Sequence, residues 1–192
     1  MYFFNLKPNL TGQPTFLSNF LAEAQCKAII DSCEANARGG IEDGKVHDDV
    51  RQSEISWLAP EGEHRWLFDK VKDCMNAVTS DSFRYDLIGF EGIQFTKYRY
   101  VAGRSDFYSS HVDTLLSDGT VRKLSFTIQL SGSETYDSGD VMLYRSLIDS
   151  MALSRAIGSI SFFPSYTIHE VHPVTRGVRY SLVGWGRGPA FS

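Results

Sequence analysis

The chain has 192 residues, of which 42% are hydrophobic and 22% are charged, and this balance excludes a wholly disordered polypeptide. Its net charge of −4 disfavours a sequence-independent nucleic-acid binder, which is normally basic. No apolar run approaches the roughly 20 residues of a membrane-spanning helix, and residues 1–5 lack the character of a signal peptide. We therefore expect a soluble, cytoplasmic protein with no membrane or nucleic-acid partner.

The length fits one domain, which we expect to cover residues 1–192 with a helical part at about 1–80 and a β core at about 85–188. The three cysteines are an odd number and include no CxxC pair, which disfavours a thiolate zinc site. Cys26 and Cys33 lie seven residues apart in a helical pattern, so we expect one buried helix face rather than a disulfide.

The first third of the chain has mostly helical patterns. A helix is predicted at 19–37, where Ser18 can cap its first turn and the glycine pair at 39–40 ends it. A strand is predicted at 50–58, and a second helix follows at 61–79. The segments 38–49 and 99–110 are candidate lids over a substrate.

From residue 87 onward the pattern changes to strands. In 93–100 and in 124–130, polar and apolar side chains alternate, so each strand has one polar and one apolar face. Further strands are predicted at 141–144, 156–163, 167–171 and 178–186. Many short strands behind a helical segment predict a mainly β protein, either a sandwich or a small barrel, with supporting N-terminal helices. The polar faces either meet solvent or line an internal pocket.

The candidate metal ligands favour the internal pocket. His111 and Asp113 are two residues apart, and in a strand both would point to the same side. Such a pair is weak evidence alone, and a third ligand must come from elsewhere, for which His169 is the candidate. Two histidines and one carboxylate on one side of an ion leave its other positions open, an arrangement that suits Fe(II).

A second signal follows ten residues after His169. Residues 173–177 form a predicted turn, and folding the flanking strands symmetrically about Val174 places Arg179 opposite His169. Ser181 shares the face of Arg179. A guanidinium and a hydroxyl near the metal could hold a carboxylate by charge-assisted hydrogen bonds. The joint occurrence of these motifs is more specific than any one of them.

The order and spacing of motifs across residues 50–185 carry a family resemblance. They are Arg51-Gln52-Ser53 with Trp57-Leu58, His111-x-Asp113, and the segments 124–130, 136–141, 163–165, 169–174 and 177–181 with Trp185. In these motifs the sequence resembles the Fe(II)/2-oxoglutarate-dependent dioxygenases, in particular the prolyl 4-hydroxylase-like branch. The resemblance implies a double-stranded β-helix, which is a jelly roll.

The resemblance also implies roles for individual residues. It implies His111, Asp113 and His169 as iron ligands and Arg179 as the partner of the distal carboxylate of 2-oxoglutarate. Two departures from the family pattern are Ser138-Gly139 in place of a glycine pair, and Arg179 where collagen-type members commonly have lysine.

Contacts to the cosubstrate follow from the same resemblance, and two substrate contacts are proposed from sequence position. Tyr98 matches a tyrosine of the cosubstrate pocket, and Tyr100 competes for this role because the stretch before the first histidine is longer than usual. Ser125 matches a hydroxyl that some members place on 2-oxoglutarate. Tyr108 and Arg51 are candidate substrate contacts, with packing and a salt-bridged surface position as their respective alternatives.

The implied reaction is the hydroxylation of a C–H bond with Fe(II), 2-oxoglutarate and dioxygen, and ascorbate as a potential reductant. A prolyl residue in a peptide or protein is the favoured substrate. The first alternative is a hydroxylase of a free amino acid or other small metabolite on the same scaffold. The second is a jelly-roll module that binds a ligand or a metal without turnover. A halogenase is disfavoured because Asp113 fills the position that a halide would need.

Overall fold

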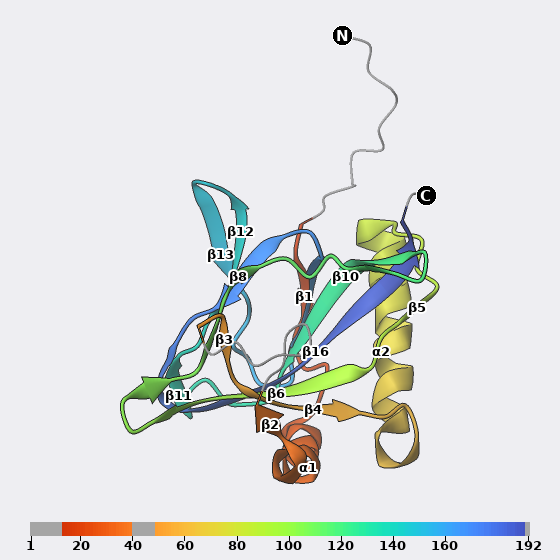
Figure 1. Cartoon of the computed structure of the whole chain (residues 1–192). Coiled ribbons are helices and arrows are strands. Elements are labelled where there is room, and N and C mark those ends of the chain that lie inside the picture. The colour runs from red at the N-terminus through yellow and green to blue at the C-terminus, as the bar shows by residue number, and fades with distance from the viewer. Residues whose placement is uncertain (1–12, 40–48, 191–192) are drawn as a thin grey trace.

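The computed structural model describes residues 13–39 and 49–190, which form two antiparallel β-sheets and two α-helices (Figure 1). The larger sheet has the order β1-β14-β10-β16-β6-β4-β2, and four short strands pair beside this path. Its main strands are β1 (Thr15–Leu17), β14 (Ile160–Pro164), β10 (Thr120–Gln129), β16 (Val174–Pro189), β6 (Ile93–Val101), β4 (Glu54–Leu58) and β2 (Arg38–Gly39). The short strands are β5 (Gly89–Phe90), β7 (Arg104–Ser105), β9 (Leu116–Ser117) and β11 (Tyr136–Ser138).

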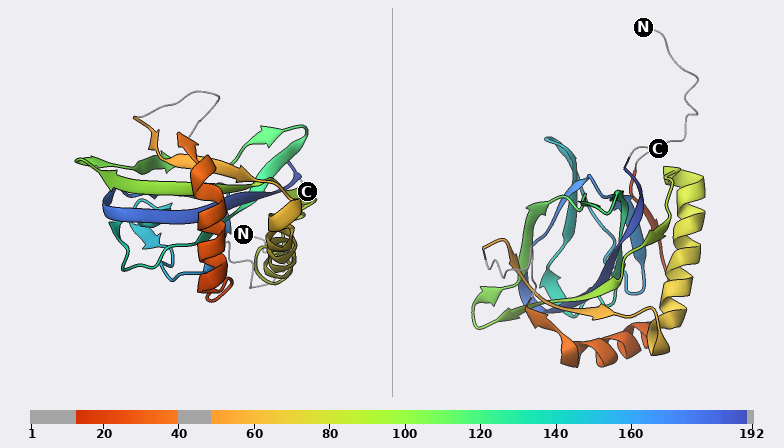
Figure 2. Two further views of the ribbon diagram at one scale, coloured as in Figure 1. Left: turned by 90° about the horizontal axis from the view of Figure 1, so that it is seen from below. Right: turned by 45° about the vertical axis from the view of Figure 1, so that its right-hand side comes forward.

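The smaller sheet has the order β13-β12-β15-β8-β3. Its strands are β13 (Asp149–Ala152), β12 (Val141–Ser146), β15 (Ile168–Val171), β8 (Phe107–His111) and β3 (Arg51–Gln52). The two sheets face each other, as the end-on view in Figure 2 shows. This arrangement confirms the mainly β fold with N-terminal helices that the sequence predicts.

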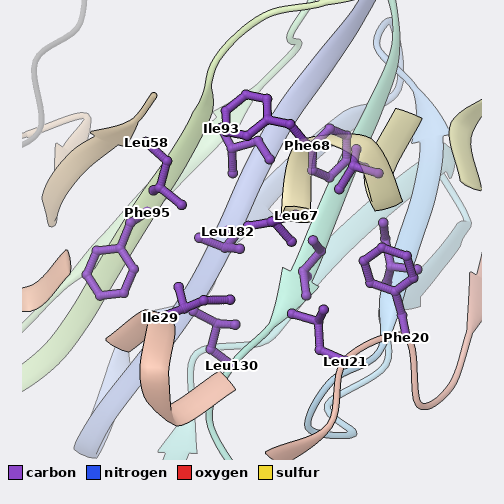
Figure 3. Close-up of a cluster of buried hydrophobic side chains, with 14 of the residues drawn as sticks. Phe20, Leu21, Ile29, Leu58, Leu67, Phe68, Ile93, Phe95, Leu130 and Leu182 are labelled. Carbon is purple, nitrogen blue, oxygen red and sulfur yellow. The ribbon is translucent and has the colours of Figure 1, made fainter. Parts of the chain in front are cut away.

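Both helices cover the outer face of the larger sheet (Figure 2). Buried side chains at helical spacing in α1 (Glu23–Cys33) and α2 (Arg65–Val78) pack on the apolar face of β6, β10 and β16. Figure 3 shows part of this cluster, with Ile29 of α1 and Leu67 of α2 near Leu182 of the sheet. In the described chain, neither helix is long and apolar enough to cross a membrane.

The polar faces of the same strands point the other way, toward the smaller sheet. Their buried members are Gln94, Thr96 and Tyr98 of β6, Ser125, Thr127 and Gln129 of β10, and Arg179 and Ser181 of β16. Because these side chains alternate with the core residues, burial of both faces requires a second layer over the polar side. The internal pocket, rather than solvent, is therefore the correct interpretation of the alternating pattern.

The helix boundaries differ from the predicted ones. The first helix begins at Glu23 after Ala22, not after Ser18, because Asn19 has a left-handed backbone with φ of 56°. The helix ends at Cys33 and continues as one 3₁₀ turn (Glu34–Asn36). The second helix is preceded by the 3₁₀ turn Gly62–His64, and the five-residue π-helical turn Thr79–Phe83 follows it.

The strand predicted at 50–58 also differs from prediction, and the structure describes one of the two candidate lids. The strand predicted at 50–58 is divided at Ser53, so that β3 belongs to the smaller sheet and β4 to the larger one. The candidate lid at 99–110 is mostly a β-hairpin of β6 and β7, whose turn residues Ala102 and Gly103 both have positive φ. Of the other candidate lid, residues 40–48 lie outside the described residues.

Candidate iron centre and cosubstrate pocket

A cavity of about 400 Å³ lies between the two sheets. Its walls come from β6, β10 and β16 of the larger sheet and from β8 and β15 of the smaller one. Trp57, Val112 and Leu115 line this cavity and are also exposed to solvent, so they mark its mouth. Arg179 lines it as well and is only 4% exposed.

The three predicted metal ligands converge in this cavity. His111 ends β8 and pairs directly with His169 of β15, while Asp113 follows β8 by two residues. Potential ligand atoms of all three lie within 4.8 Å of one another. Nε2 of His169 is 3.3 Å from Oδ2 of Asp113, and Nε2 of His111 is 3.7 Å from Oδ1. Two imidazole nitrogens and one carboxylate oxygen form a donor set that fits Fe(II).

Neighbouring groups orient each of these side chains. Nδ1 of His111 donates to the carbonyl oxygen of Ser109 at 2.7 Å, and Nδ1 of His169 donates to that of Thr167 at 2.9 Å. These bonds leave both Nε2 atoms to face the cation position. The Ser125 hydroxyl donates to Oδ2 of Asp113 at 2.7 Å. The triad is thus held in place by the protein itself.

The ionised carboxylate of Asp113 gives the triad a negative charge that favours a cation. Burial alone would raise the pKa of Asp113, but hydrogen bonding to His169 and the two histidine charges hold it well below its usual range. Burial, together with the His169 charge, lowers the pKa of His111 to about 4. Burial also opposes charge on His169, but its hydrogen bond to Asp113 and the carboxylate charge raise its pKa. An ionised carboxylate and a neutral His111 are ready to donate electron pairs to a metal.

The buried Arg179 guanidinium marks the inner end of the cavity. Arg179 pairs in register with Tyr98 of β6, and its Cζ lies 5.8 Å from the centre of the tyrosine ring. Its Nη1 donates to Oγ of Ser181 at 3.2 Å, and that hydroxyl is 2.7 Å from Oγ1 of Thr96. Within the described chain no carboxylate forms an ion pair with Arg179. A buried guanidinium of this kind fits a ligand carboxylate.

The strand arrangement that places Arg179 in the cavity differs from the predicted one. His169 and Arg179 do not face each other across a hairpin, because β15 lies in the smaller sheet and β16 in the larger one. The chain crosses between the sheets at residues 172–173, and the two side chains meet the same cavity from opposite walls. The predicted hairpin is therefore wrong, although both residues line one pocket.

The remaining predicted cosubstrate contacts differ in their burial and in whether they line the cavity. Tyr98 is 3% exposed and lines the cavity, whereas Tyr100 is 43% exposed and does not line it. Ser181 lies beside Arg179 as expected. The Ser125 hydroxyl points to Asp113 instead of the open cavity, and Oγ of Ser165 lies 2.9 Å from it. The structure thus gives Ser125 a supporting contact to a metal ligand.

Both candidate substrate contacts lie on the cavity wall. The Arg51 guanidinium lies 4.7 Å from the centre of the Tyr108 ring, and that ring stacks on His111 with 3.7 Å between centroids. Arg51 is buried and donates to Ser53 and Gln94, so it is not the salt-bridged surface arginine of the alternative interpretation.

One cluster at the mouth was missed by sequence reasoning. Arg122 lies 4.0 Å above the ring of Trp185 and donates both Nε and Nη2 to Glu91. Trp185 also contacts Trp57, with ring centres 6.1 Å apart. Only the tertiary fold brings these residues together, since Glu91 and Arg122 lie on different segments with no shared motif. The fold and this cavity define a jelly-roll protein with the donor set of a non-haem iron oxygenase.

Comparisons with known proteins agree with that class. The family model of the 2OG-Fe(II) oxygenase superfamily matches residues 93–187, which include the triad and Arg179. A PKHD-type hydroxylase of Idiomarina loihiensis is 26% identical over 88% of this chain and 75% of the relative. A PKHD-type hydroxylase of Synechococcus sp. strain CC9605 is 39% identical, over 45% of this chain and 38% of that relative.

Solved structures show the same fold at low sequence identity. A prolyl-4-hydroxylase of Pseudomonas putida has a TM-score of 0.73 at 21% identity, covering 91% of each chain. A prolyl hydroxylase of Trichoplax adhaerens, in complex with a hypoxia inducible factor peptide fragment, has a TM-score of 0.74 at 18% identity and covers 92% of this chain and 84% of its own. The family-model match, the PKHD-type relatives and the prolyl hydroxylase structures together support a 2OG-Fe(II) oxygenase that is similar to the prolyl 4-hydroxylases. It is a dioxygenase, and its family uses Fe(II), 2-oxoglutarate and dioxygen.

Proposed function

We propose that this protein hydroxylates an unactivated C–H bond of a prolyl residue in a peptide or protein. One observation carries the proposal: the triad of His111, Asp113 and His169 and the buried Arg179 line the same cavity. A protein that only binds a ligand does not need a metal ligated from one side. It also does not need a buried guanidinium that has no carboxylate partner among the described residues. The combination is what a metal-bound 2-oxo acid requires.

Each group has a separate task in this proposal. The triad holds the metal from one side and leaves its remaining positions facing the cavity. Fe(II) and 2-oxoglutarate, when bound, would activate dioxygen, which is the oxidant, and protein side chains alone cannot supply this chemistry. Arg179 binds the distal carboxylate, and its hydrogen bond to Ser181 fixes the direction of the guanidinium. The two sheets exclude water from the inner end.

The mouth of the cavity supports a peptide or protein substrate. Trp57 is 54% exposed and lines the cavity, and it contacts Trp185 deeper inside. Val112 and Leu115 add apolar surface at the same opening. Exposed aromatic and aliphatic side chains at a pocket mouth favour contact with residues that flank the reacting one. A free amino acid would leave this surface uncovered.

The experiment compares proline-containing peptides with free amino acids in the presence of Fe(II), 2-oxoglutarate and dioxygen. We expect succinate, together with a mass increase of one oxygen atom on a prolyl residue of a peptide. Oxygenation of a free amino acid in preference to every peptide would overturn the substrate assignment and favour the metabolite hydroxylase.

A pair of tryptophan variants tests the mouth. Trp57→Ala should raise the KM for the peptide by about fivefold or more, because an aromatic contact is lost. Trp66→Ala, on the exposed side of α2 and away from the cavity, is the matched control and should leave that KM unchanged. Equal values for both variants would show that Trp57 does not contact the substrate.

A further inference from the structure

Thr127 has a buried hydroxyl with no hydrogen-bond partner among the described residues. It lies within β10, between Val183 of β16 and Ser161 of β14, and its side chain belongs to the inner polar face. The residue is 8% exposed, and Oγ1 itself is buried and unpaired. Because unpaired buried hydroxyls are unfavourable, a hydroxyl at this position needs a partner that is absent from the protein chain.

Thr127 borders the same point of the cavity as Arg179. A small hollow of about 10 Å³ adjoins the main cavity at its inner end. Three residues line both spaces, namely Thr127, Val141 and Arg179. A carboxylate bound by the Arg179 guanidinium therefore lies beside the wall that Thr127 forms.

Two other polar side chains near this point, those of Gln129 and Ser181, already have partners. Gln129 donates its Nε2 to the carbonyl oxygen of Ser131 and to the hydroxyl of Tyr136, both at 3.1 Å. Ser181 is bound to Arg179 and to Thr96. Thr127 differs from them because its O–H donor remains unused.

We propose that Thr127 is a second contact to the distal carboxylate of 2-oxoglutarate, donating its O–H to a carboxylate oxygen beside Arg179. A carboxylate has about four lone-pair sites, so it accepts from both residues at once. The inference rests on the proposed role of Arg179. It also explains why this position carries a hydroxyl, although an aliphatic side chain of the same shape would suit the strand equally well.

A bridging water is the competing explanation. The hollow is about the size of one water molecule, and Nε of Arg155, which lines it too, is also unpaired. The two explanations differ in the ligand-free protein. A structural water would make the hydroxyl stabilising without any ligand, whereas a carboxylate contact exists only when 2-oxoglutarate is bound.

Two variants separate these explanations. Thr127→Val keeps the shape and removes the hydroxyl, and Thr127→Ser keeps the hydroxyl. We expect Thr127→Val to weaken 2-oxoglutarate binding to the Mn(II)-loaded protein under anaerobic conditions by about three- to tenfold, with Thr127→Ser within about twofold of wild type. Mn(II) affinity should be unchanged. 2-Oxobutyrate, which lacks the distal carboxylate, should bind wild type and Thr127→Val equally.

Thermal unfolding of the metal-free protein completes the test. We expect Thr127→Val to be at least as stable as wild type, since its hydroxyl has no partner there. A lower Tm for Thr127→Val would overturn the proposal in favour of the bridging water, and so would equal losses of affinity for both oxo acids. Wild-type affinity for 2-oxoglutarate in Thr127→Val would overturn the Thr127 contact alone. If wild type itself fails to bind 2-oxoglutarate, the role of Arg179 falls together with it.

Discussion

The hydroxyl of Ser125 donates a 2.7 Å hydrogen bond to Oδ2 of Asp113, the oxygen that also lies 3.3 Å from Nε2 of His169. Ser125 belongs to β10 of the larger sheet, whereas Asp113 follows β8 of the smaller one. The bond therefore links the two sheets at the metal position. The bond also fixes the orientation of the Asp113 carboxylate, so that this group stays directed at the cation position.

Ser125→Ala should weaken Mn(II) binding by about tenfold, because a ligating carboxylate loses the group that orients it. Ser161→Ala, also buried on the inner face but on β14, is the control and should keep wild-type affinity. The measurement is Mn(II) titration followed by electron paramagnetic resonance. Equal affinities in both variants would mean that the hydrogen bond does not support the metal site.

Tyr98 and Tyr100 compete for the cosubstrate role, and their burial favours Tyr98. Tyr98→Phe should weaken anaerobic 2-oxoglutarate binding by roughly threefold or more, since one hydrogen bond to a charged group is lost. Tyr100→Phe should not change it, because that side chain lies outside the cavity. The reverse order of effects would assign the role to Tyr100.

Arg179→Ala should weaken 2-oxoglutarate binding by at least about tenfold, as expected for the loss of a charge-assisted hydrogen bond. Arg179→Lys should lie between this variant and wild type, because it keeps the charge but loses the planar fork. Mn(II) affinity should change little, since no metal ligand is removed. Titration of 2-oxoglutarate into the Mn(II)-loaded protein is the test, and wild-type binding by Arg179→Ala would exclude a cosubstrate contact.

Glu91 should contribute a pH-dependent part of the stability. Burial would raise its pKa, but hydrogen bonds from Arg122 and Arg187 outweigh burial and lower the pKa of Glu91 below its usual range. A depressed carboxyl pKa means that the stabilisation is complete above the unfolded-state pKa and is lost as pH falls through the lower folded-state value. Glu91→Gln should therefore cost about 2 kcal/mol at neutral pH and progressively less in acid.

Urea unfolding of wild type and Glu91→Gln at neutral and acidic pH measures this difference. Asp31→Asn, which removes the exposed pair with Lys27, is the control and should cost at most about 0.5 kcal/mol. A difference between wild type and Glu91→Gln that does not depend on pH would show that the ionised carboxylate is not the stabilising form.

The triad could be predicted because its geometry is largely local. Residues i and i+2 of an extended segment share a side, and this rule brings together His111, which ends β8, and Asp113, which lies two residues beyond that strand. The polar faces of β6 and β10 follow from the same alternation. The third ligand, His169, is not local in sequence and is predicted because an imidazole completes a set of two histidines and one carboxylate. In the structure β15 places His169 directly beside His111.

The parts that could not be predicted depend on pairing between distant strands. Nothing local at Ser53 shows that the chain passes from one sheet to the other, and the same holds for the passage before β16. For that reason the symmetric hairpin placed Arg179 near His169 by an incorrect route. The bond from Ser125 to Asp113 is likewise invisible in a strand pattern, because it spans both sheets.

The central claim is that the metal held by His111, Asp113 and His169 turns over 2-oxoglutarate in this cavity. The most direct measurement is succinate formation by wild type and by Asp113→Ala, with Fe(II), dioxygen and a prolyl peptide, after circular dichroism has shown that both are folded. We predict succinate with wild type, coupled to peptide oxygenation, and loss of both with Asp113→Ala. Full turnover by Asp113→Ala, or none by iron-loaded wild type with any prolyl peptide or amino acid, would contradict the account.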